Sequence, residues 1–387
     1  MSGLRDRPPF APGPEPPTTP GELRTSIPAC GSVAYFNTGA TGPTPEPILD
    51  TVDRWHRRHK TDVLIESDPY AVGFDAYDAC RERVAPFLGA DPAEVALAES
   101  TGDALSAVIA ALELESGDRV VTTDLEHPAA DLPLGYLRDR RGIEIERVAT
   151  DAGRIDTDRF AAAVADAEVA CFSSLSWNYG TLLPVEELVG IARDAGAFTL
   201  VDAVQEPGHR PLDVTAWGAD AVAASGHKWL LGVWGSGILY VDGDAADRLH
   251  PAQLSYRGAA AADDPRPAAG ARRFERGTAS IAPHVGLAES VRFADSVGME
   301  TVSAEVRRLA DRLVSGLDAD RVLSPTDAET GLVTVDVPEP EATVERLRDA
   351  GVAIRSLPDP DAVRASVHAF NTDREVDRLA ELLADEY

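Results

Sequence analysis

Lysine is almost absent from this chain, and one of the two lysines that remain stands where an amine could react. The 387 residues include 36 lysines and arginines, of which only Lys60 and Lys228 are lysines. A lysine amine condenses with an aldehyde to form a Schiff base, whereas the arginine guanidinium stays charged and cannot. A site that needs such an amine keeps its lysine, which favours a chemical role for at least one of the two.

The surroundings of the two lysines differ. Lys60 ends the polar run Arg57-Arg58-His59-Lys60, which is typical of a solvated face. Lys228 follows an apolar run at 219–224 and lies in Ser225-Gly226-His227-Lys228-Trp229, ahead of a glycine-rich stretch. We therefore expect Lys60 at the surface and Lys228 just beyond the end of a buried strand.

Other reactive side chains also follow predicted strands. Apolar runs predict strands at 95–98, 120–122, 169–173, 198–201 and 219–224, with helices such as 104–112 and 185–195 between them. This alternation predicts an α/β fold with a parallel, doubly wound sheet, whose ligands bind beyond the carboxyl ends of the strands. We expect the residues at these ends to share one site: Thr101, His127, Asp202, Gln205 and Lys228.

These residue types match the functional groups of pyridoxal 5′-phosphate (PLP). Lys228 would carry the aldimine and later shuttle a proton. Asp202 would pair with the pyridine nitrogen, Gln205 would hydrogen-bond the phenolic oxygen, and His127 would stack on the ring. A single histidine in a loop or aspartate after a strand is often only a cap or turn residue, so the prediction depends on the combination.

A phosphate site is predicted where the strand at 95–98 meets the next helix. The turn reads Ser100-Thr101-Gly102-Asp103, and free backbone N–H groups together with the helix dipole favour an anion there. Thr101 and Gly102 are therefore expected to bind cofactor. The same residues also form an ordinary N-cap, and that alternative stays open.

The composition excludes several kinds of partner. The net charge of −29 and the pI near 4.5 argue against nucleic acid and anionic membranes. The acidic, lysine-poor composition indicates a salt-adapted cytoplasm, with a GC-rich genome as the alternative. The three cysteines match no metal or disulfide pattern, and we expect no metal site. Neither a spanning apolar run nor a signal peptide is found, so we expect a cytoplasmic protein.

Changes in composition divide the chain into three parts. Residues 1–29 are expected to form an extended or disordered arm. Residues 30–258 carry the strands above and form the expected large cofactor-binding domain. Residues 259–387 are expected to hold an Ala/Pro-rich loop at 259–271, a bridging helix at 282–296 and a small α+β domain. Its helices are predicted at 304–317, 342–350 and 374–383, and its strands at 332–337, 352–355 and 363–367.

Four motifs resemble the class V aminotransferase family of PLP fold type I, which includes the cysteine desulfurases. They are Val201–Gln205, Ser225–Lys228, Phe274–Thr278 and Arg364–Thr372. The resemblance implies a large domain with a mainly parallel sheet sandwiched by helices, followed by a smaller α+β domain. It also implies PLP as cofactor, an amino acid as substrate and a homodimer.

The resemblance assigns further residues to the site. Gly277 and Thr278 would reach the phosphate in the active site of the partner subunit. Ser225 and His227 would hold the phosphate within the same subunit. Arg364 would bind the substrate carboxylate, a bidentate task that suits a guanidinium, and Trp177 and Asn178 are expected in the substrate pocket.

Departures from the family pattern bear on the reaction. Cysteine desulfurases carry a mobile loop with a nucleophilic cysteine before the arginine that matches Arg364, but here only 356–363 separate Arg355 from Arg364, and no cysteine follows Cys171. Trp177 and Ala130 stand where desulfurases usually have asparagine, which resembles the epimerase-like and lyase-like branch. We therefore expect aminotransferase, lyase or epimerase chemistry on a small amino acid. The alternatives are a cysteine desulfurase, a selenocysteine lyase or a non-catalytic scaffold.

Overall fold

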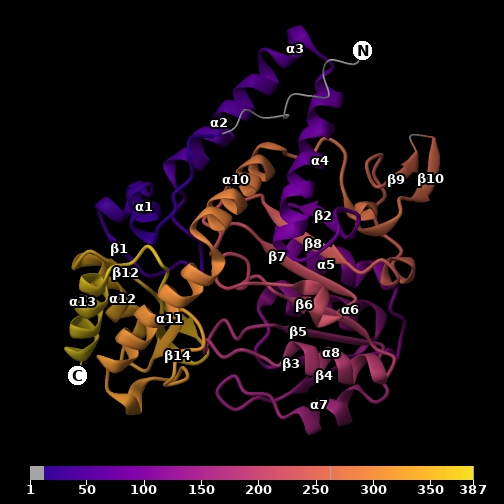
Figure 1. Ribbon diagram of the computed structural model, residues 1–387. Coiled ribbons are helices and arrows are strands. Elements are labelled where there is room, and N and C mark those ends of the chain that lie inside the picture. Colours follow the sequence, from indigo (N-terminus) through magenta and orange to yellow (C-terminus); the bar gives the residue numbers. More distant parts are fainter. Residues whose placement is uncertain (1–12, 262, 387) are drawn as a thin grey trace.

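A seven-stranded sheet forms the centre of the structure (Figure 1). The computed structural model describes residues 13–261 and 263–386. The strand order is β2-β8-β7-β6-β5-β3-β4, and β8 runs in the opposite direction to the other strands of this sheet. The strands are β2 (Val95–Ala98), β3 (Arg119–Thr123), β4 (Glu144–Val148), β5 (Val169–Ser173), β6 (Phe198–Asp202), β7 (Ala221–Ser225) and β8 (Gly237–Val241). The predicted α/β class with a mainly parallel sheet is confirmed.

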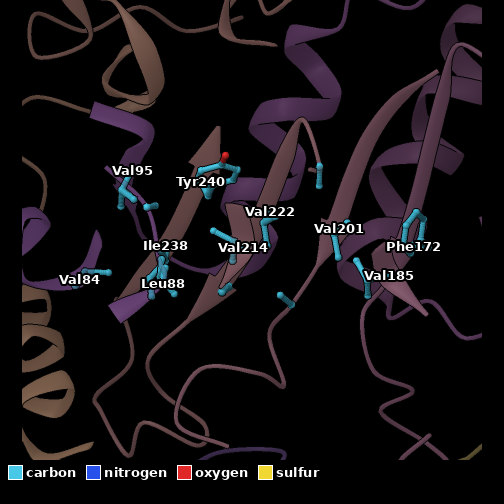
Figure 2. Close-up of a cluster of buried hydrophobic side chains, with 14 of the residues drawn as sticks. Val84, Leu88, Val95, Phe172, Val185, Val201, Val214, Val222, Ile238 and Tyr240 are labelled. Carbon is cyan, nitrogen blue, oxygen red and sulfur yellow. The ribbon is translucent and has the colours of Figure 1, made fainter. Parts of the chain in front are cut away.

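Helices cover both faces of this sheet (Figure 1). Side chains alternate along a strand, so Val201 and Val222 face one helical layer whereas Leu200 and Ala221 face the other. Figure 2 shows the first cluster, in which Phe172 joins the two valines. The first layer holds α4 (Pro69–Phe87), α7 (Thr157–Val164), α8 (Val185–Asp194), α9 (Val214–Trp217) and α10 (Ala282–Val297), and the second holds α5 (Thr101–Ala111) and α6 (Pro128–Arg141).

A second, three-stranded antiparallel sheet lies in the C-terminal part, in the order β11-β14-β13. Its core contains Leu309, Leu347 and Leu379, one from each of three helices. The elements are α11 (Met299–Ser315), β11 (Leu332–Val335), α12 (Pro340–Asp349), β12 (Val352–Ala353), β13 (Arg355–Pro358), β14 (Asp361–Ser366) and α13 (Asp373–Ala384). Within the described residues, no helix has the length and apolar character needed to cross a membrane.

The N-terminal segment differs from the expected arm. Residues 1–12 lie outside the described residues, but α1 (Pro20–Thr25) is helical and buries Leu23 to 5% exposure. The short strand β1 (Ala34–Tyr35) pairs in parallel with β12. Residues 20–29 are thus not extended, because Leu23 packs in an apolar cluster with Phe370 of the C-terminal part. β1 likewise packs with the C-terminal part rather than with the large sheet, to which our division assigned it.

Further elements can be compared with the prediction. The expected loop at 259–271 forms a short hairpin of β9 (Ala259–Ala261) and β10 (Asp264–Pro267). The expected bridging helix, α10, packs on α2 (Glu46–Lys60) and α4, while Phe293 and Val297 near its end pack with Val302 and Val306 of α11, as a bridge between the two parts requires. We did not predict α2 or the short α3 (Val63–Glu66), because α2 buries few apolar side chains, such as Ile48 and Trp55.

A buried ion cluster fixes the turn that carries residues 276–278. Glu275 has a fully buried side chain that accepts hydrogen bonds from Arg81 and Arg257, with Nη2–Oε distances of 2.7–2.9 Å. Arg257 also pairs with Asp78 at 3.1 Å. Two guanidinium groups therefore share one buried carboxylate, and its removal would leave both without their main counter-charge.

Glu275→Ala should lower the free energy of unfolding by about 3–5 kcal/mol, the usual cost of leaving a buried charge without its partner. Urea unfolding followed by circular dichroism measures this. Asp264→Ala is the matched control, because Asp264 pairs with Arg266 at the exposed hairpin, where ion pairs contribute little. Equal destabilisation of the two variants would contradict the importance of the buried cluster.

Candidate active site

A cavity of about 220 Å³ lies at the carboxyl ends of the parallel strands. Thr101 follows β2, His127 precedes α6 after β3, Asp202 ends β6, and Lys228 follows β7. Gln205, three residues beyond Asp202, also lines the cavity. The structure thus brings together the five residues that the strand-end pattern selected. Gly102, Trp177, His227 and Arg364 also line the cavity.

Burial controls the ionisation of Lys228. Burial lowers the pKa of its amine to about 7, the nearby Asp202 carboxylate works in the opposite direction, and Arg364 and Arg355 lower it further. Burial also raises the pKa of Asp202. The hydrogen bond from the Val204 N–H at 2.9 Å and the charge of Lys228 lower this pKa, but burial is the larger effect. Since the lysine pKa lies near neutrality, a large fraction of the amine is uncharged and nucleophilic at pH 7.

His127 presents a neutral ring to the cavity. Its Nδ1 accepts a hydrogen bond from the Ala129 N–H at 3.1 Å and caps α6. Burial, followed by the charges of Lys228 and Arg355, lowers the pKa of His127 to about 4. Its ring meets Trp177 edge to face, with centroids 5.5 Å apart, and the Trp177 indole is held by the Leu125 carbonyl. An uncharged imidazole fixed in this way can stack on an aromatic ligand.

Two arginines form the opposite wall. Arg364 is fully buried; its Nη1 donates to the Trp177 carbonyl at 2.6 Å, while Nε and Nη2 have no hydrogen-bond partner in the described part of the chain. Arg355 lies directly opposite Arg364 in the β13–β14 register. Burial and the charge of Arg355 lower the pKa of Arg364 to about 9. Like charges in paired positions destabilise a sheet. A carboxylate bound here would accept hydrogen bonds from the unpaired Nε and Nη2 of Arg364, and its negative charge would reduce the repulsion between the two arginines.

The N-terminus of α5 lines another side of the cavity. Ser100 caps the helix by accepting from the Asp103 N–H, and this confirms that the turn is an N-cap. The Thr101 hydroxyl is nevertheless buried without a hydrogen-bond partner among the described residues. An unpaired hydroxyl at a helix N-terminus that faces a cavity suits a phosphate oxygen. The cap and the anion site are therefore compatible.

The structure does not bring every predicted residue to the cavity. The Ser225 hydroxyl instead lies 2.6 Å from His227 Nδ1 and 3.3 Å from the Ser236 carbonyl. The Asn178 amide is engaged by the Ser176 hydroxyl and the Asp359 carbonyl, and it does not line the cavity because Asn178 packs between the two sheets. For these two residues the expected direct contact with ligand stays a prediction. Gly277 and Thr278 are also distant from the cavity, and Thr278 lines a separate hollow between α2 and α4.

Sequence reasoning missed several lining residues. Arg355 is the most important of them. The sequence did contain a signal for it, because Arg355 and Arg364 flank a short proline-containing segment, and a hairpin turn there places the two arginines opposite each other. The others are Gly39, Ala40, Ser100, Ala129, Ser173, Leu175 and Val204. Most are small or apolar residues, whose types carry no chemical signal.

The donor set of the cavity fits PLP. An uncharged amine at Lys228, a buried carboxylate at Asp202 and an unpaired hydroxyl at Thr101 correspond to the aldehyde, the pyridine nitrogen and the phosphate. The free N–H groups of Arg364 suit the carboxylate of an amino acid. The fold and this site together define a PLP-dependent enzyme.

Comparison with known proteins agrees with this conclusion. The sequence model of the family Aminotransferase class-V matches residues 34–379, so the chain belongs to the class V aminotransferase family. A probable cysteine desulfurase of Pyrococcus abyssi is 29% identical over 95% of this chain and 97% of its own length. The isopenicillin N epimerase of Streptomyces clavuligerus is 29% identical over 91% and 94%, respectively.

The fold of a solved lyase is also similar. C-DES, a cystine C-S lyase, superimposes with TM-scores of 0.87 and 0.86 at 25% identity, over 93–94% of this chain and 99% of its own. One C-DES structure holds glycine covalently linked to the PLP cofactor, and another holds the reaction product cysteine persulfide. The chain is thus a PLP-dependent enzyme of fold type I.

The low pKa of Lys228 predicts how PLP uptake depends on pH. The neutral amine is the reactive form, so uptake by the apoprotein should rise steeply as the pH increases through about 7 and then level off. An ordinary lysine would show this rise near pH 10.4. The measurement is the initial rate of borohydride-trappable PLP incorporation from about pH 5.5 to beyond the ordinary lysine pKa of about 10.4.

Asp202→Asn provides the matched test, because Asp202 raises the pKa of Lys228. The rise in uptake should move to lower pH in this variant, while PLP binding becomes weaker. Lys228→Ala should trap no PLP at any pH. A rise centred near pH 10 in the unmodified chain would contradict the buried amine.

Proposed function

We propose that this enzyme is a lyase that eliminates a sulfur leaving group from the Cβ of a small L-cysteine derivative, with no protein thiol taking part. The observation that carries the proposal is the position of the cysteines. Cys80 and Cys171 are fully buried in helix α4 and strand β5, and Cys30 lies in an apolar cluster with α1. None of the three lines the cavity.

Burial also makes these thiols unreactive. It raises the pKa of Cys30 to about 11 and that of Cys171 well above its usual range. The thiolate is the nucleophile in persulfide chemistry, so a raised pKa suppresses it. The segment where desulfurases carry their cysteine loop is here the hairpin β13–β14, with Pro358 paired to Asp361 across a tight turn.

The cavity residues suit elimination. Bound PLP supplies an electron sink that stabilises negative charge on the substrate Cα. Arg364 binds the α-carboxylate, and Lys228 Nζ takes the proton from Cα. The Cβ–S bond then breaks with its electron pair on sulfur. The released enamine hydrolyses to pyruvate and ammonia, and the sulfur leaves as a thiol or persulfide.

Arg355 favours a substrate with a second carboxylate. Its guanidinium lies 6.0 Å from the centre of the Trp177 ring at the cavity wall, beside the buried Arg364. Two cations exceed what one α-carboxylate needs. Cystine has two carboxylates, and C-DES is a cystine C-S lyase. Elimination from cystine consumes one water and yields pyruvate, ammonia and cysteine persulfide.

Product analysis tests the proposal. With L-cystine, the holoenzyme should form equal amounts of pyruvate and cysteine persulfide, and no alanine. The triple variant Cys30→Ser, Cys80→Ala, Cys171→Ala should keep this activity to within a few fold if it folds, whereas Lys228→Ala should lose it.

Other products would decide between the alternatives. Alanine together with a persulfide on one of the three cysteines would establish a desulfurase and overturn the proposal. Alanine from selenocysteine would indicate a selenocysteine lyase, an inverted amino acid an epimerase, and a keto acid that retains the side chain an aminotransferase. Pyruvate formation by the cysteine-free variant is the result that supports the lyase.

We also propose a homodimer in the cytoplasm, in which Gly277 and Thr278 approach the partner's phosphate site. The hollow beside Thr278 is lined by aromatic side chains of α2 and α4, and Ile65 next to it is 87% exposed, with Leu64 at 56%. Burial of such side chains against a second copy would stabilise association.

Mixing two inactive variants tests this arrangement. Thr278→Glu should repel the phosphate in the partner's site, and Lys228→Ala removes the amine from its own site. Mixed dimers contain one site with both residues intact, so activity should reappear after the variants are exchanged under mildly dissociating conditions. Sedimentation analysis serves as the control. A monomer, or a dimer without recovered activity, would contradict the shared site.

A further inference from the structure

A buried aromatic column lies behind the cavity wall. The imidazole of His209 stacks on the indole of Trp229, with ring centroids 3.7 Å apart and planes 3° from parallel. His368 stacks more loosely on the same indole at 5.9 Å, and Phe370 follows at 4.8 Å from His368. All four side chains are at most 2% exposed. None lines the cavity, yet Trp229 is the neighbour of Lys228.

Trp229 determines the orientation of the Gln205 amide. The indole Nε1 donates to Gln205 Oε1 at 2.7 Å, and Gln205 Nε2 donates to the Gly39 carbonyl at 3.1 Å. An indole N–H can only donate and a carbonyl can only accept. A rotated amide would place two donors against each other and two acceptors against each other, at the cost of both buried hydrogen bonds.

Gln205 therefore offers the cavity a donor and no acceptor. One N–H of Gln205 Nε2 donates to the Gly39 carbonyl, and Oε1 accepts from the indole. The second N–H of Nε2 is therefore the group that can still bind a ligand. A ligand atom beside this amide must accept a hydrogen bond. The phenolic oxygen of PLP in its anionic form meets that requirement.

The indole is itself fixed from several sides. His209 Nδ1 donates to the Gln205 carbonyl at 3.0 Å, and its Nε2 accepts from the Gly331 N–H at 2.8 Å, so both ring nitrogens are occupied. His368 Nε2 donates to the Trp229 carbonyl at 3.1 Å. Gly208 has a φ of +85°, and a Cβ there would lie 2.5 Å from the Trp229 backbone. Only glycine permits this approach.

We propose that Trp229, clamped by His209, is a positioning residue that locks Gln205 as a hydrogen-bond donor to the phenolic oxygen of the cofactor. This inference rests on the cofactor role of Gln205. An N–H that donates to this oxygen withdraws charge from it and weakens its attraction for a proton on the adjacent imine nitrogen. Without Trp229 only the bond to the Gly39 carbonyl holds the amide, so its orientation is less strictly fixed and the oxygen keeps more of its charge.

The visible absorption of bound PLP reports this effect. The absorption of the bound cofactor changes when its imine nitrogen is protonated, and the pH midpoint of this change can be measured. Loss of the Gln205 donor should raise this midpoint by about one unit, the size expected for one hydrogen bond to a charged group. Gln205→Ala and Trp229→Phe should both shift the midpoint upward, and the double variant should shift no further than Gln205→Ala alone. Trp217→Phe is the matched control, because Trp217 lies on α9 away from the cavity, and it should leave the midpoint unchanged.

The double variant separates positioning from general stability. Additive shifts, or an unchanged midpoint in Trp229→Phe, would overturn the inference. If Trp229→Phe shows no cooperative thermal unfolding, Gln205→Glu replaces it, since glutamate still accepts from the indole but has no N–H for the cavity. Its midpoint should rise at least as far as that of Gln205→Ala, and an unchanged midpoint would overturn the donor assignment. A chain that traps no PLP would instead contradict the cofactor site itself.

Discussion

Burial of the Lys228 amine beside Asp202 is the interaction on which the site depends. A charged ammonium is costly in a dry environment, and the two arginines of the opposite wall add to that cost. Asp202 offsets part of it, so that the pKa of the lysine settles near 7 rather than lower. The sheet contributes to this balance because helices cover both of its faces and the strand ends lie in a buried environment. A more exposed lysine would remain charged.

The cavity is lined by polar groups that lack a hydrogen-bond partner or a counter-charge within the described residues. Thr101 and Arg364 carry buried polar atoms without partners in the described residues, and Arg355 faces Arg364 in the neighbouring strand. Such features are unfavourable in an empty protein and become favourable once a phosphate and a carboxylate bind. The surface of the chain is strongly acidic, with a net charge of −29. The negative net charge repels anionic ligands, whereas the cations of the cavity attract them locally.

The two sheets supply different sides of the site. The large sheet holds the residues that match the cofactor, and the hairpin β13–β14 of the small sheet holds both arginines. Their relative position depends on contacts between the sheets. Arg364 donates to the Trp177 carbonyl, and the Thr334 hydroxyl donates to the Asn178 carbonyl at 2.5 Å. The geometry of the site thus depends on packing between distant segments as well as on the reactive groups.

Sequence reasoning was sufficient for features that local patterns determine. β2 and β5 were predicted with the boundaries that the structure shows, because both are short, largely buried and mainly apolar. The grouping of Thr101, His127, Asp202 and Lys228 followed from a topological rule, since the carboxyl ends of parallel strands share one edge.

Other features were decided only by tertiary structure. The pairing of β1 with β12 joins residues more than 300 positions apart. The role of Arg355 depends on the register of a hairpin, and the orientation of Gln205 depends on an indole 24 positions away. The hydrogen bonds of the Asn178 amide to Ser176 and the Asp359 carbonyl likewise depend on the packing of distant segments. Residue type and spacing show which groups can react, whereas hydrogen-bond partners and burial are settled only when the whole chain is packed.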